Sequence, residues 1–209
     1  AFGGSEAVSI IVVGEQGCFY VGESHYMMKL AGGPKLNEVK LDITDDLSRT
    51  VYLAARALNK RVEDLVVCIL NRPRHTKIIE ELRQFNVRIK LINDCDCLAA
   101  VATCFPECGI DLLVGIGGNT EGVLSAAAIK CLGGFFQCYL CDKEGNKTTG
   151  AILDKSTLIR NNVIFCATAI LNGMLLRGVR CVPGGYITHS LITDSAARSL
   201  QRIETFHWI

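Results

Sequence analysis

The sequence predicts an α/β fold, a layered sandwich with a mainly parallel sheet. Three short apolar runs occupy the centre of the chain, and each is followed by a polar turn and then by a helical pattern. These runs are residues 66–70, 89–92 and 112–116. Consecutive βαβ units join parallel strands through right-handed crossovers, so the three runs are expected to lie side by side in one sheet.

The segments around these strands have the periodicity of amphipathic helices. After Thr44, a suitable helix cap, apolar residues recur at helical spacing over residues 47–58, and the same spacing returns over residues 78–85. The helices that follow the second and third strands are rich in alanine. Small side chains let a helix lie close to a sheet, so these helices are expected to pack directly on the strands.

Both ends of the chain are predicted to contain strands. Residues 7–13 and 18–21 are expected to form an opening hairpin, followed by a loop around residues 32–34. Beyond Gly133 the pattern changes to strand-like runs at 135–140, 162–170, 186–192 and 199–206. We expect these runs to complete the same sheet, so that residues 1–209 form a single α/β domain.

Composition and charge exclude several classes of function. Lys and Arg total 22 and Asp and Glu total 21, a net charge of +1 that gives no broad basic surface for nucleic acid. No apolar run approaches the roughly 20 residues that span a bilayer, so no transmembrane segment is expected. The eleven cysteines are an odd number in a chain of 209 residues. This favours a reducing, intracellular compartment, either the cytoplasm or an organelle, over a disulfide-dependent secreted scaffold.

The cysteines allow two interpretations. Cys138 and Cys141 form a C-x-x-C motif, which can bind zinc or carry out redox chemistry. The sequence has no second C-x-x-C and no histidine pair at zinc spacing, and most other cysteines lie in apolar segments. Burial as small hydrophobic side chains is therefore favoured over a metal or redox site.

Polar turns follow the three central strands, at the end of a sheet where ligands bind in α/β proteins. They span residues 71–75, 93–96 and 115–122 and contain two arginines, two aspartates and a glycine-rich stretch with a glutamate. Each turn alone has a structural explanation, as a solvated loop, a helix cap or a tight strand-to-helix connection. Together, cations, paired carboxylates and exposed amides suit a phosphorylated polyol, so a sugar phosphate is the expected ligand.

Other candidates are weaker. Tyr26 and Lys29 precede this region and could reach a phosphate, although packing and solubility also explain them. His25, His189 and His207 have no partner at catalytic spacing, and the sequence has no G-x-S-x-G motif. A serine or cysteine hydrolase is therefore not expected.

Four stretches carry a resemblance to a known family. They are the RPRH run from Arg72 to His75, the D-x-D pair Asp94 and Asp96, residues 115–134 and residues 198–207. Together they closely resemble class II fructose-1,6-bisphosphatases, including the cyanobacterial enzymes that also accept sedoheptulose bisphosphate. The resemblance spans essentially the whole chain in order, and the block at 115–134, GIGGNTEGVLSAAAIKCLGG, is long and specific.

The resemblance implies a sugar-phosphatase-like fold and a hydrolase of carbohydrate metabolism that uses Mg or Mn. The implied substrate is fructose 1,6-bisphosphate or sedoheptulose 1,7-bisphosphate. The implied site residues are Tyr26, Arg72 and Arg74 for the distal phosphate, Asp94 and Asp96 for sugar hydroxyls, and Glu121 for a metal ion. These residue types suit the roles, because guanidinium groups bind phosphate bidentately and hard cations prefer carboxylate oxygens.

The chain also departs from the family's pattern. The catalytic Asp-Pro-Ile/Leu-Glu/Asp-Gly-Thr run and the carboxylates upstream of it are absent, which leaves Glu121 as the one expected metal ligand. Cys95 stands where the D-x-D turn normally has glycine, and the segment 142–161 is shorter than in relatives. Residues 172–174 also replace a usual Asp-Gly-Asp-like turn. We therefore expect the chain to correspond to the C-terminal part of the family, without its N-terminal part.

Three hypotheses for function follow. In the first, the missing segment lies on the same gene product or on another chain, and the assembled protein is a sugar bisphosphatase. In the second, the chain is a catalytically inactive structural subunit of a larger assembly, and in the third it is a sugar-phosphate sensor. By itself the chain is expected to be inactive, and another chain or a second copy is expected to cover the side that the absent part covers in relatives.

Overall fold

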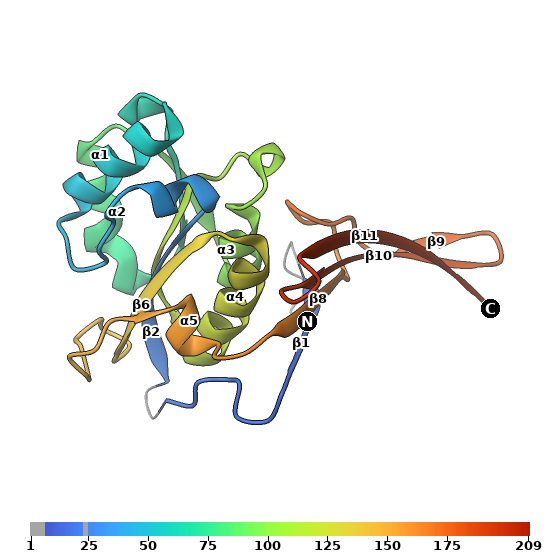
Figure 1. Cartoon of the computed structure of the whole chain (residues 1–209). Helices are drawn as coiled ribbons and strands as arrows, with labels where there is room; N and C mark the ends of the chain where they lie inside the picture. The colour runs from blue at the N-terminus through green and yellow to red at the C-terminus, as the bar shows by residue number, and fades with distance from the viewer. Residues whose placement is uncertain (1–6, 23–24) are drawn as a thin grey trace.

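Two β-sheets, with helices between and beside them, make up the structure (Figure 1). The computed structural model describes residues 7–22 and 25–209. The larger sheet has the strand order β4 (Arg88–Ile92), β3 (Val66–Leu70), β5 (Leu112–Gly118), β2 (Tyr26–Gly32), β6 (Phe135–Cys141) and β7 (Leu153–Asp154). The other sheet has the order β1 (Val8–Gly14), β8 (Val163–Ala169), β10 (Gly185–Asp194) and β11 (Ser199–Trp208), with β9 (Arg180–Val182) paired to β10.

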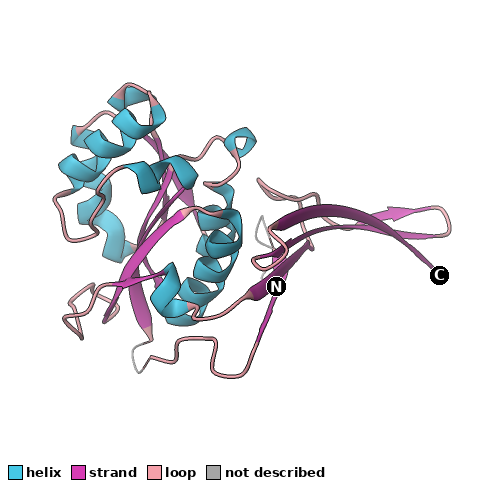
Figure 2. Ribbon diagram, in the orientation of Figure 1, coloured by secondary structure: helices cyan, strands magenta, loops and turns pink. Residues whose placement is uncertain are grey.

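The helices form two layers (Figure 2). α1 (Leu47–Leu58) and α2 (Thr76–Gln84) pack on one face of the larger sheet. α3 (Asp96–Ala102) and α4 (Asn119–Leu132) lie between the two sheets. The short helical elements are η1 (Pro34–Glu38), η2 (Val62–Asp64), η3 (Pro73–His75), η4 (Pro106–Cys108) and α5 (Lys155–Leu158). The α/β architecture that the sequence predicts is confirmed.

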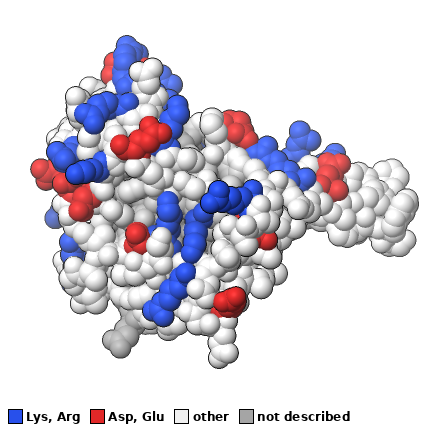
Figure 3. Space-filling model, in the orientation of Figure 1, with Lys and Arg blue, Asp and Glu red and all other residues white. Residues whose placement is uncertain are grey.

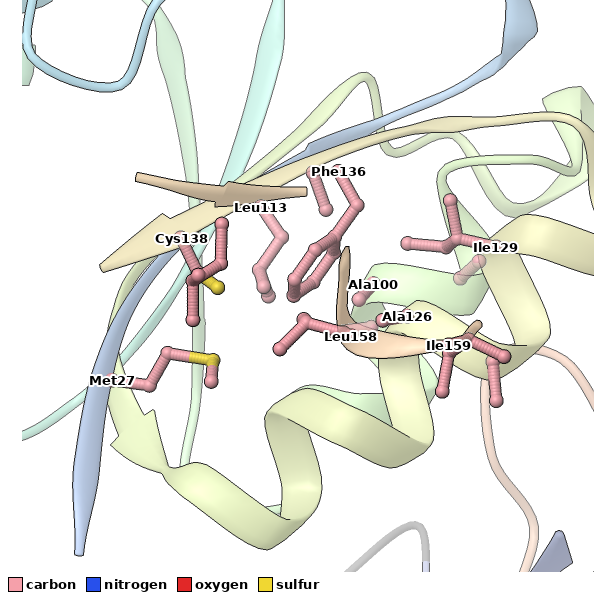
Figure 4. Close-up of a cluster of buried hydrophobic side chains, with 14 of the residues drawn as sticks. Met27, Ala100, Leu113, Ala126, Ile129, Phe136, Cys138, Leu158 and Ile159 are labelled. Atoms are coloured by element: carbon pink, nitrogen blue, oxygen red, sulfur yellow. The ribbon is translucent and has the colours of Figure 1, made fainter. Parts of the chain in front are cut away.

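Alanine-rich helices allow the close packing between the sheets. Phe136 and Leu113 point from the larger sheet toward Ala100 of α3 and Ala126 of α4 (Figure 4). All four side chains are at most 2% exposed. Because the alanine side chain ends at Cβ, α3 and α4 can approach both sheets closely. Water is thereby excluded from the two faces of each helix that contact a sheet.

The larger sheet is mixed rather than mainly parallel, which corrects the prediction. β3 pairs in parallel with β4 and with β5, as expected from the βαβ units. β2 then pairs antiparallel with both β5 and β6, and β6 pairs antiparallel with β7. The strand β2 was missed because Lys29 interrupts its apolar run and Gly32, Gly33 and Pro34 directly follow, a pattern that is typical of a loop.

The predicted opening hairpin is also wrong. β1 pairs antiparallel with β8, which lies far along the chain, and not with residues 18–21. Within 18–21, Phe19 forms an isolated bridge with Ile159. The short turn between two apolar runs suggested a local pairing, but the exposed face and the packed face of β1 match those of β8 instead.

The C-terminal strands form a sheet of their own instead of completing the larger one. The runs predicted beyond Gly133 correspond to β6, β8, β10 and β11, but only β6 joins the larger sheet. The other three pair with one another or with β1, because their inward side chains, such as Phe165 and Leu191, pack on the far side of α3 and α4. Sequence patterns give strands but not the layer to which each strand belongs.

The start of α1 differs from the prediction that Thr44 caps this helix. Asp46, not Thr44, immediately precedes α1, and it makes no capping hydrogen bond through its side chain. The Thr44 hydroxyl donates instead to Asp42 Oδ1 at 2.6 Å. Thr44 therefore stabilises the turn that leads into the helix rather than the helix itself.

Several cysteines are part of the core. Cys97 of α3 and Cys138 of β6 are 2% and 0% exposed, and both are thiols. Burial raises the pKa of each of these thiols to about 12. Both remain protonated at neutral pH, and a protonated thiol is a poor nucleophile and metal ligand.

Among the described residues, no helix has both the length and the apolar character needed to cross a membrane.

Candidate functional site

Four neighbouring strands of the larger sheet begin or end on the same side of the sheet, and we call this row of strand ends the rim. β3, β4 and β5 run parallel and end there, and polar turns follow β3 and β4. β5 leads directly into α4, so the turn predicted at 115–122 is instead the end of the strand and the first turn of the helix. β2 runs antiparallel to β5 and so begins there, with Tyr26 opposite Gly118. The rim therefore gathers residues that are far apart in sequence, at the position where α/β proteins bind ligands.

Arg74 is held in place on the rim by backbone and aromatic contacts. Its Nε and Nη2 donate hydrogen bonds to the carbonyl oxygen of Ile116, at 3.1 and 3.0 Å. Its guanidinium carbon lies 5.4 Å from the centre of the Tyr26 ring. These bonds leave the Nη1 amino group, with its two further N–H donors, to a ligand.

Arg74 borders two hollows on the α1 and α2 side of the sheet. One, of about 380 Å³, lies between these helices and the strands and is also lined by Lys77. Four carboxylates line it as well, those of Asp45, Asp46, Glu81 and Glu144. The other has a volume of about 740 Å³ and is open to solvent. Its lining residues are Pro73, Arg74, Thr76, Lys77, Glu80, Lys143 and Glu144.

Lys77 and Lys143 are cations that the sequence reasoning missed. Lys77 lies three residues after Arg74, near the start of α2, so helical spacing could have placed the two on one face. Lys143 lies in the turn after β6, and no local pattern indicates that this turn reaches the rim. The pocket therefore combines three cations with the carboxylates of Glu80 and Glu144.

Asp96 is engaged in a buried ion pair. Its Oδ2 lies 2.7 Å from Nζ of Lys29, whose side chain is fully buried, and the Asp96 side chain is 8% exposed. The pair lies against Gly117, where an added Cβ would come within 2.0 Å of Asp96 Oδ2 and 2.7 Å of Lys29 Nζ. A glycine at 117 is therefore a steric requirement for this pair.

Arg72, which follows β3, and Asp94, which follows β4, are both exposed. Arg72 Nη2 donates to the carbonyl oxygen of Asn93, and Asp94 Oδ1 accepts from the backbone N–H of Cys95 at 2.8 Å. Cys95 has a φ of 62°, in the left-handed region that favours glycine. For a residue with a Cβ, this conformation costs about 1 kcal/mol.

The His75 side chain connects the end of β3 to the end of β5 through hydrogen bonds. It was not predicted as a site residue. Its Nδ1 lies 2.7 Å from the carbonyl oxygen of Leu70, and its Nε2 accepts a hydrogen bond from the Ile116 N–H at 2.7 Å. This arrangement requires the neutral ring, with the proton on Nδ1. Burial lowers the pKa of the His75 imidazole, which agrees with that tautomer.

The predicted site residues share the rim but lie on opposite faces of the sheet. Tyr26 and Arg74 lie on the side of α1 and α2, together with Met28 and Ile116. Lys29 and Asp96 lie on the side of α3, next to Gly117. The split follows from strand geometry, because successive side chains of a strand point to opposite faces.

Glu121 lies in the first turn of α4 and is exposed. An added Cβ at Gly118, the residue before the helix, would lie 1.8 Å from Glu121 Oε2, so the carboxylate folds back over the helix start. An acidic side chain at this position stabilises the positive end of the helix dipole.

The described residues do not fit the Mg or Mn site that the resemblance implies. Within 7–22 and 25–209, no three or more His, Cys, Asp or Glu side chains are grouped so that they could hold a metal ion. A hard divalent cation takes about six oxygen ligands, and Glu121 supplies two at most. No metal-dependent step of a reaction is therefore assigned to these residues.

Lys29→Met is expected to lower the free energy of unfolding by about 3–5 kcal/mol, because it leaves Asp96 charged and buried without its partner. Arg49→Met is the control, since the Arg49–Asp45 pair is 59% and 30% exposed and should contribute about 1 kcal/mol or less. Urea denaturation of both variants, and of Lys29→Met/Asp96→Leu, measures the difference. Equal losses for the two single variants would contradict a specific role for the buried pair, whereas the double variant should recover most of the loss.

Stability is expected to fall as the pH drops below about 6.5, the ordinary pKa of histidine. Because the pKa of His75 is lowered in the folded protein, the unfolded chain binds more protons in this range, and stability then rises with pH. His75→Gln keeps a donor and an acceptor but does not titrate. Urea denaturation between pH 5 and pH 8 should therefore show a flatter profile for this variant, and an unchanged profile would exclude His75 as the source.

Comparisons with known proteins agree with the resemblance seen in the sequence. The family model described as "Bacterial fructose-1,6-bisphosphatase, glpX-encoded" matches residues 1–207. Proteins named D-fructose 1,6-bisphosphatase class 2/sedoheptulose 1,7-bisphosphatase are similar to the chain. Those of Crocosphaera subtropica and Synechocystis sp. are 33% identical to it, and that of Synechococcus elongatus is 32% identical. Each alignment covers 99% of this chain and 66% of the relative, so the chain spans about two thirds of the relatives' length. The chain belongs to the family of bacterial, glpX-encoded fructose-1,6-bisphosphatases.

Proposed function

We propose that this chain is the sugar-phosphate-binding part of a class II fructose-1,6-bisphosphatase and corresponds to the C-terminal part of that family. Its relatives are named for activity on fructose 1,6-bisphosphate and sedoheptulose 1,7-bisphosphate. We further propose that residues 1–209 act as one domain, which is supported by the packing of α3 and α4 against both sheets.

The position of Arg74 supports phosphate binding most directly. Its guanidinium is fixed by the Ile116 carbonyl and lies beside the Tyr26 ring. Lys77 borders the same two hollows. A preorganised arginine beside a lysine suits a phosphate dianion, because little side-chain entropy is lost on binding and the hydrogen bonds are charge-assisted. Arg72 lies two residues before Arg74 in the same segment and is proposed to contribute a further positive charge to the distal phosphate, although it lines neither hollow and its guanidinium donates to the Asn93 carbonyl.

The sugar is proposed to extend from this phosphate along the rim toward the D-x-D turn. Asp94 is exposed and can accept hydrogen bonds from hydroxyl groups through Oδ2. The Asp96 side chain is 8% exposed and its Oδ2 already accepts from Lys29, so Oδ1 is the oxygen with more capacity to accept from a hydroxyl. Asp96 would then orient the turn as much as it binds the sugar. Glu121, at the start of α4, is proposed as one ligand of a Mg or Mn ion whose other ligands are not among the described residues.

The chain alone is proposed to be inactive, because hydrolysis of a phosphate monoester depends on positioned metal ions that neutralise charge on the transferred group. The alternative is a structural subunit in which the phosphatase fold serves only in assembly. A reducing, intracellular compartment is proposed for either case, in keeping with thiols such as Cys97 and Cys138 that are buried in the core.

Arg74→Ala is expected to weaken the binding of fructose 1,6-bisphosphate by about 1.5–3 kcal/mol, the usual loss on removing a hydrogen bond to a charged group. Isothermal titration calorimetry at constant ionic strength measures the change. Arg83→Ala is the control, because Arg83 is exposed near the end of α2 and borders neither hollow. Unchanged affinity in a folded Arg74→Ala protein would remove Arg74 from the site.

The isolated chain is expected not to release phosphate from fructose 1,6-bisphosphate above the rate of a blank, with either Mg or Mn. A phosphate-release assay tests this, with a full-length cyanobacterial relative as the positive control. Turnover by the purified chain at a rate close to that of the relative would contradict the proposal. Absence of turnover together with absence of sugar-phosphate binding would favour the structural subunit instead.

A further inference from the structure

The second sheet extends beyond the helices as an arm, formed by β9 and the adjoining ends of β10 and β11 (Figure 1). Residues 181–187 and 205–209 in this arm contain no Lys, Arg, Asp or Glu, and its end is uncharged in the view of Figure 3. Several of its large side chains are exposed, including Phe206 at 36%, Trp208 at 84% and Ile209 at 89%. An apolar projection of this kind is typical of a contact surface.

β11 is an edge strand with ten residues. Within the part of the chain that the structure describes, β11 pairs with β10 and no strand pairs with its outer edge. Edge strands that must remain single are usually short or protected by proline, lysine or a bulge. β11 contains neither proline nor lysine, and its pairing with β10 is regular over its whole length. Its outer backbone groups are thus available to another strand.

The sequence of β11 is complementary to itself. Residues at equal distances on either side of Ile203 match each other in kind. The nearest two carry opposite charges, the next two are polar, and the two after those are apolar. If two such strands pair antiparallel with Ile203 at the centre, the facing residues are Arg202 with Glu204, Gln201 with Thr205, and Leu200 with Phe206. All of these pairs are favourable on the surface of a sheet, and in each the two side chains lie on the same face.

The charges also select this register. Centring the pairing on Arg202 would place two arginines face to face, and centring it on Glu204 would place two glutamates face to face. Like charges directly opposite each other destabilise a strand pair, so both neighbouring registers are disfavoured. Within the chain, Arg202 contacts Glu107, and Glu204 lies 2.8 Å from His189. The side chains of Arg202 and Glu204 are still 52% and 53% exposed, which leaves them able to reach a second copy.

We propose that two copies of this chain associate by antiparallel pairing of their β11 strands around a two-fold axis at Ile203, which joins their second sheets into one continuous sheet. A two-fold interface uses the same surface of both copies, as a self-complementary strand requires. Phe206, whose ring centre lies 4.5 Å from that of Trp208, would then pack against Leu200 of the second copy. The proposal does not depend on sugar-phosphate binding, because β11 belongs to the second sheet whereas the rim belongs to the larger sheet.

Sedimentation equilibrium of the purified chain tests the association. A dimer of twice the 22.7 kDa chain mass is expected. Ile203→Lys should weaken dimerisation at least tenfold, because two ammonium groups would face each other at the axis. Gln201→Lys is the matched control, with the same charge on the same face of the same strand, and should remain dimeric because it would face Thr205. A monomeric parent chain, or an Ile203→Lys variant as dimeric as the control, would overturn the proposal.

Cross-linking provides a second test that requires no loss of folding. Ile203→Cys should give a disulfide-linked dimer on mild oxidation, since a residue at the axis faces its own copy, with Cβ atoms about 5 Å apart. Thr205→Cys is the control, because the two copies of residue 205 would lie about 14 Å apart along the strands. Mass spectrometry distinguishes a disulfide between the two copies of residue 203 from links through native cysteines. Failure of the Ile203→Cys variant to cross-link more than the Thr205→Cys variant would exclude this register.

Discussion

The burial of α3 and α4 on two sides is the constraint on which the structure depends. Each of these helices faces the larger sheet on one side and the second sheet on the other, so neither has a fully solvent-exposed flank. Six of their alanines, Ala99, Ala100, Ala102, Ala126, Ala127 and Ala128, are fully buried. Larger side chains at these positions would separate the layers, and smaller ones would leave voids. The same helices begin at the rim, so their packing also determines where Asp96 and Glu121 lie.

The rim shows how backbone geometry divides chemistry between two sides of a sheet. On the side of α1 and α2, Arg74 is stabilised by a backbone carbonyl and an aromatic ring and remains positively charged toward solvent. On the side of α3, Lys29 and Asp96 neutralise each other away from water. The end of β5 lies between these two groups, where Asp96 and Lys29 fill the space beside Gly117 and Glu121 fills the space beside Gly118. The glycines matter there because they have no side chain, not because their backbone is unusual.

Sequence reasoning succeeded where structure is local and failed where it depends on distant partners. β3, β4 and β5 were predicted because each apolar run precedes its own helix, and Arg74 lies in the segment between β3 and α2, where the sequence pattern placed it. β2 was missed, since its position between β5 and β6 depends on pairing with strands far along the chain. Lys143 was missed for the same reason. The buried partner of Asp96 could not be inferred either, because a lysine in an apolar run gives no sign of the carboxylate it will meet.

The placement of α4 connects the rim to the second sheet. The helix has 14 residues, so it is about 21 Å long. Its start carries Glu121 at the rim, and along its length it contacts β8 and β10 of the second sheet. Because α4 packs against both sheets, the position of Glu121 depends on the second sheet as well as on the larger one. A change in the spacing between the two sheets would therefore have to move α4 or open voids around its alanines.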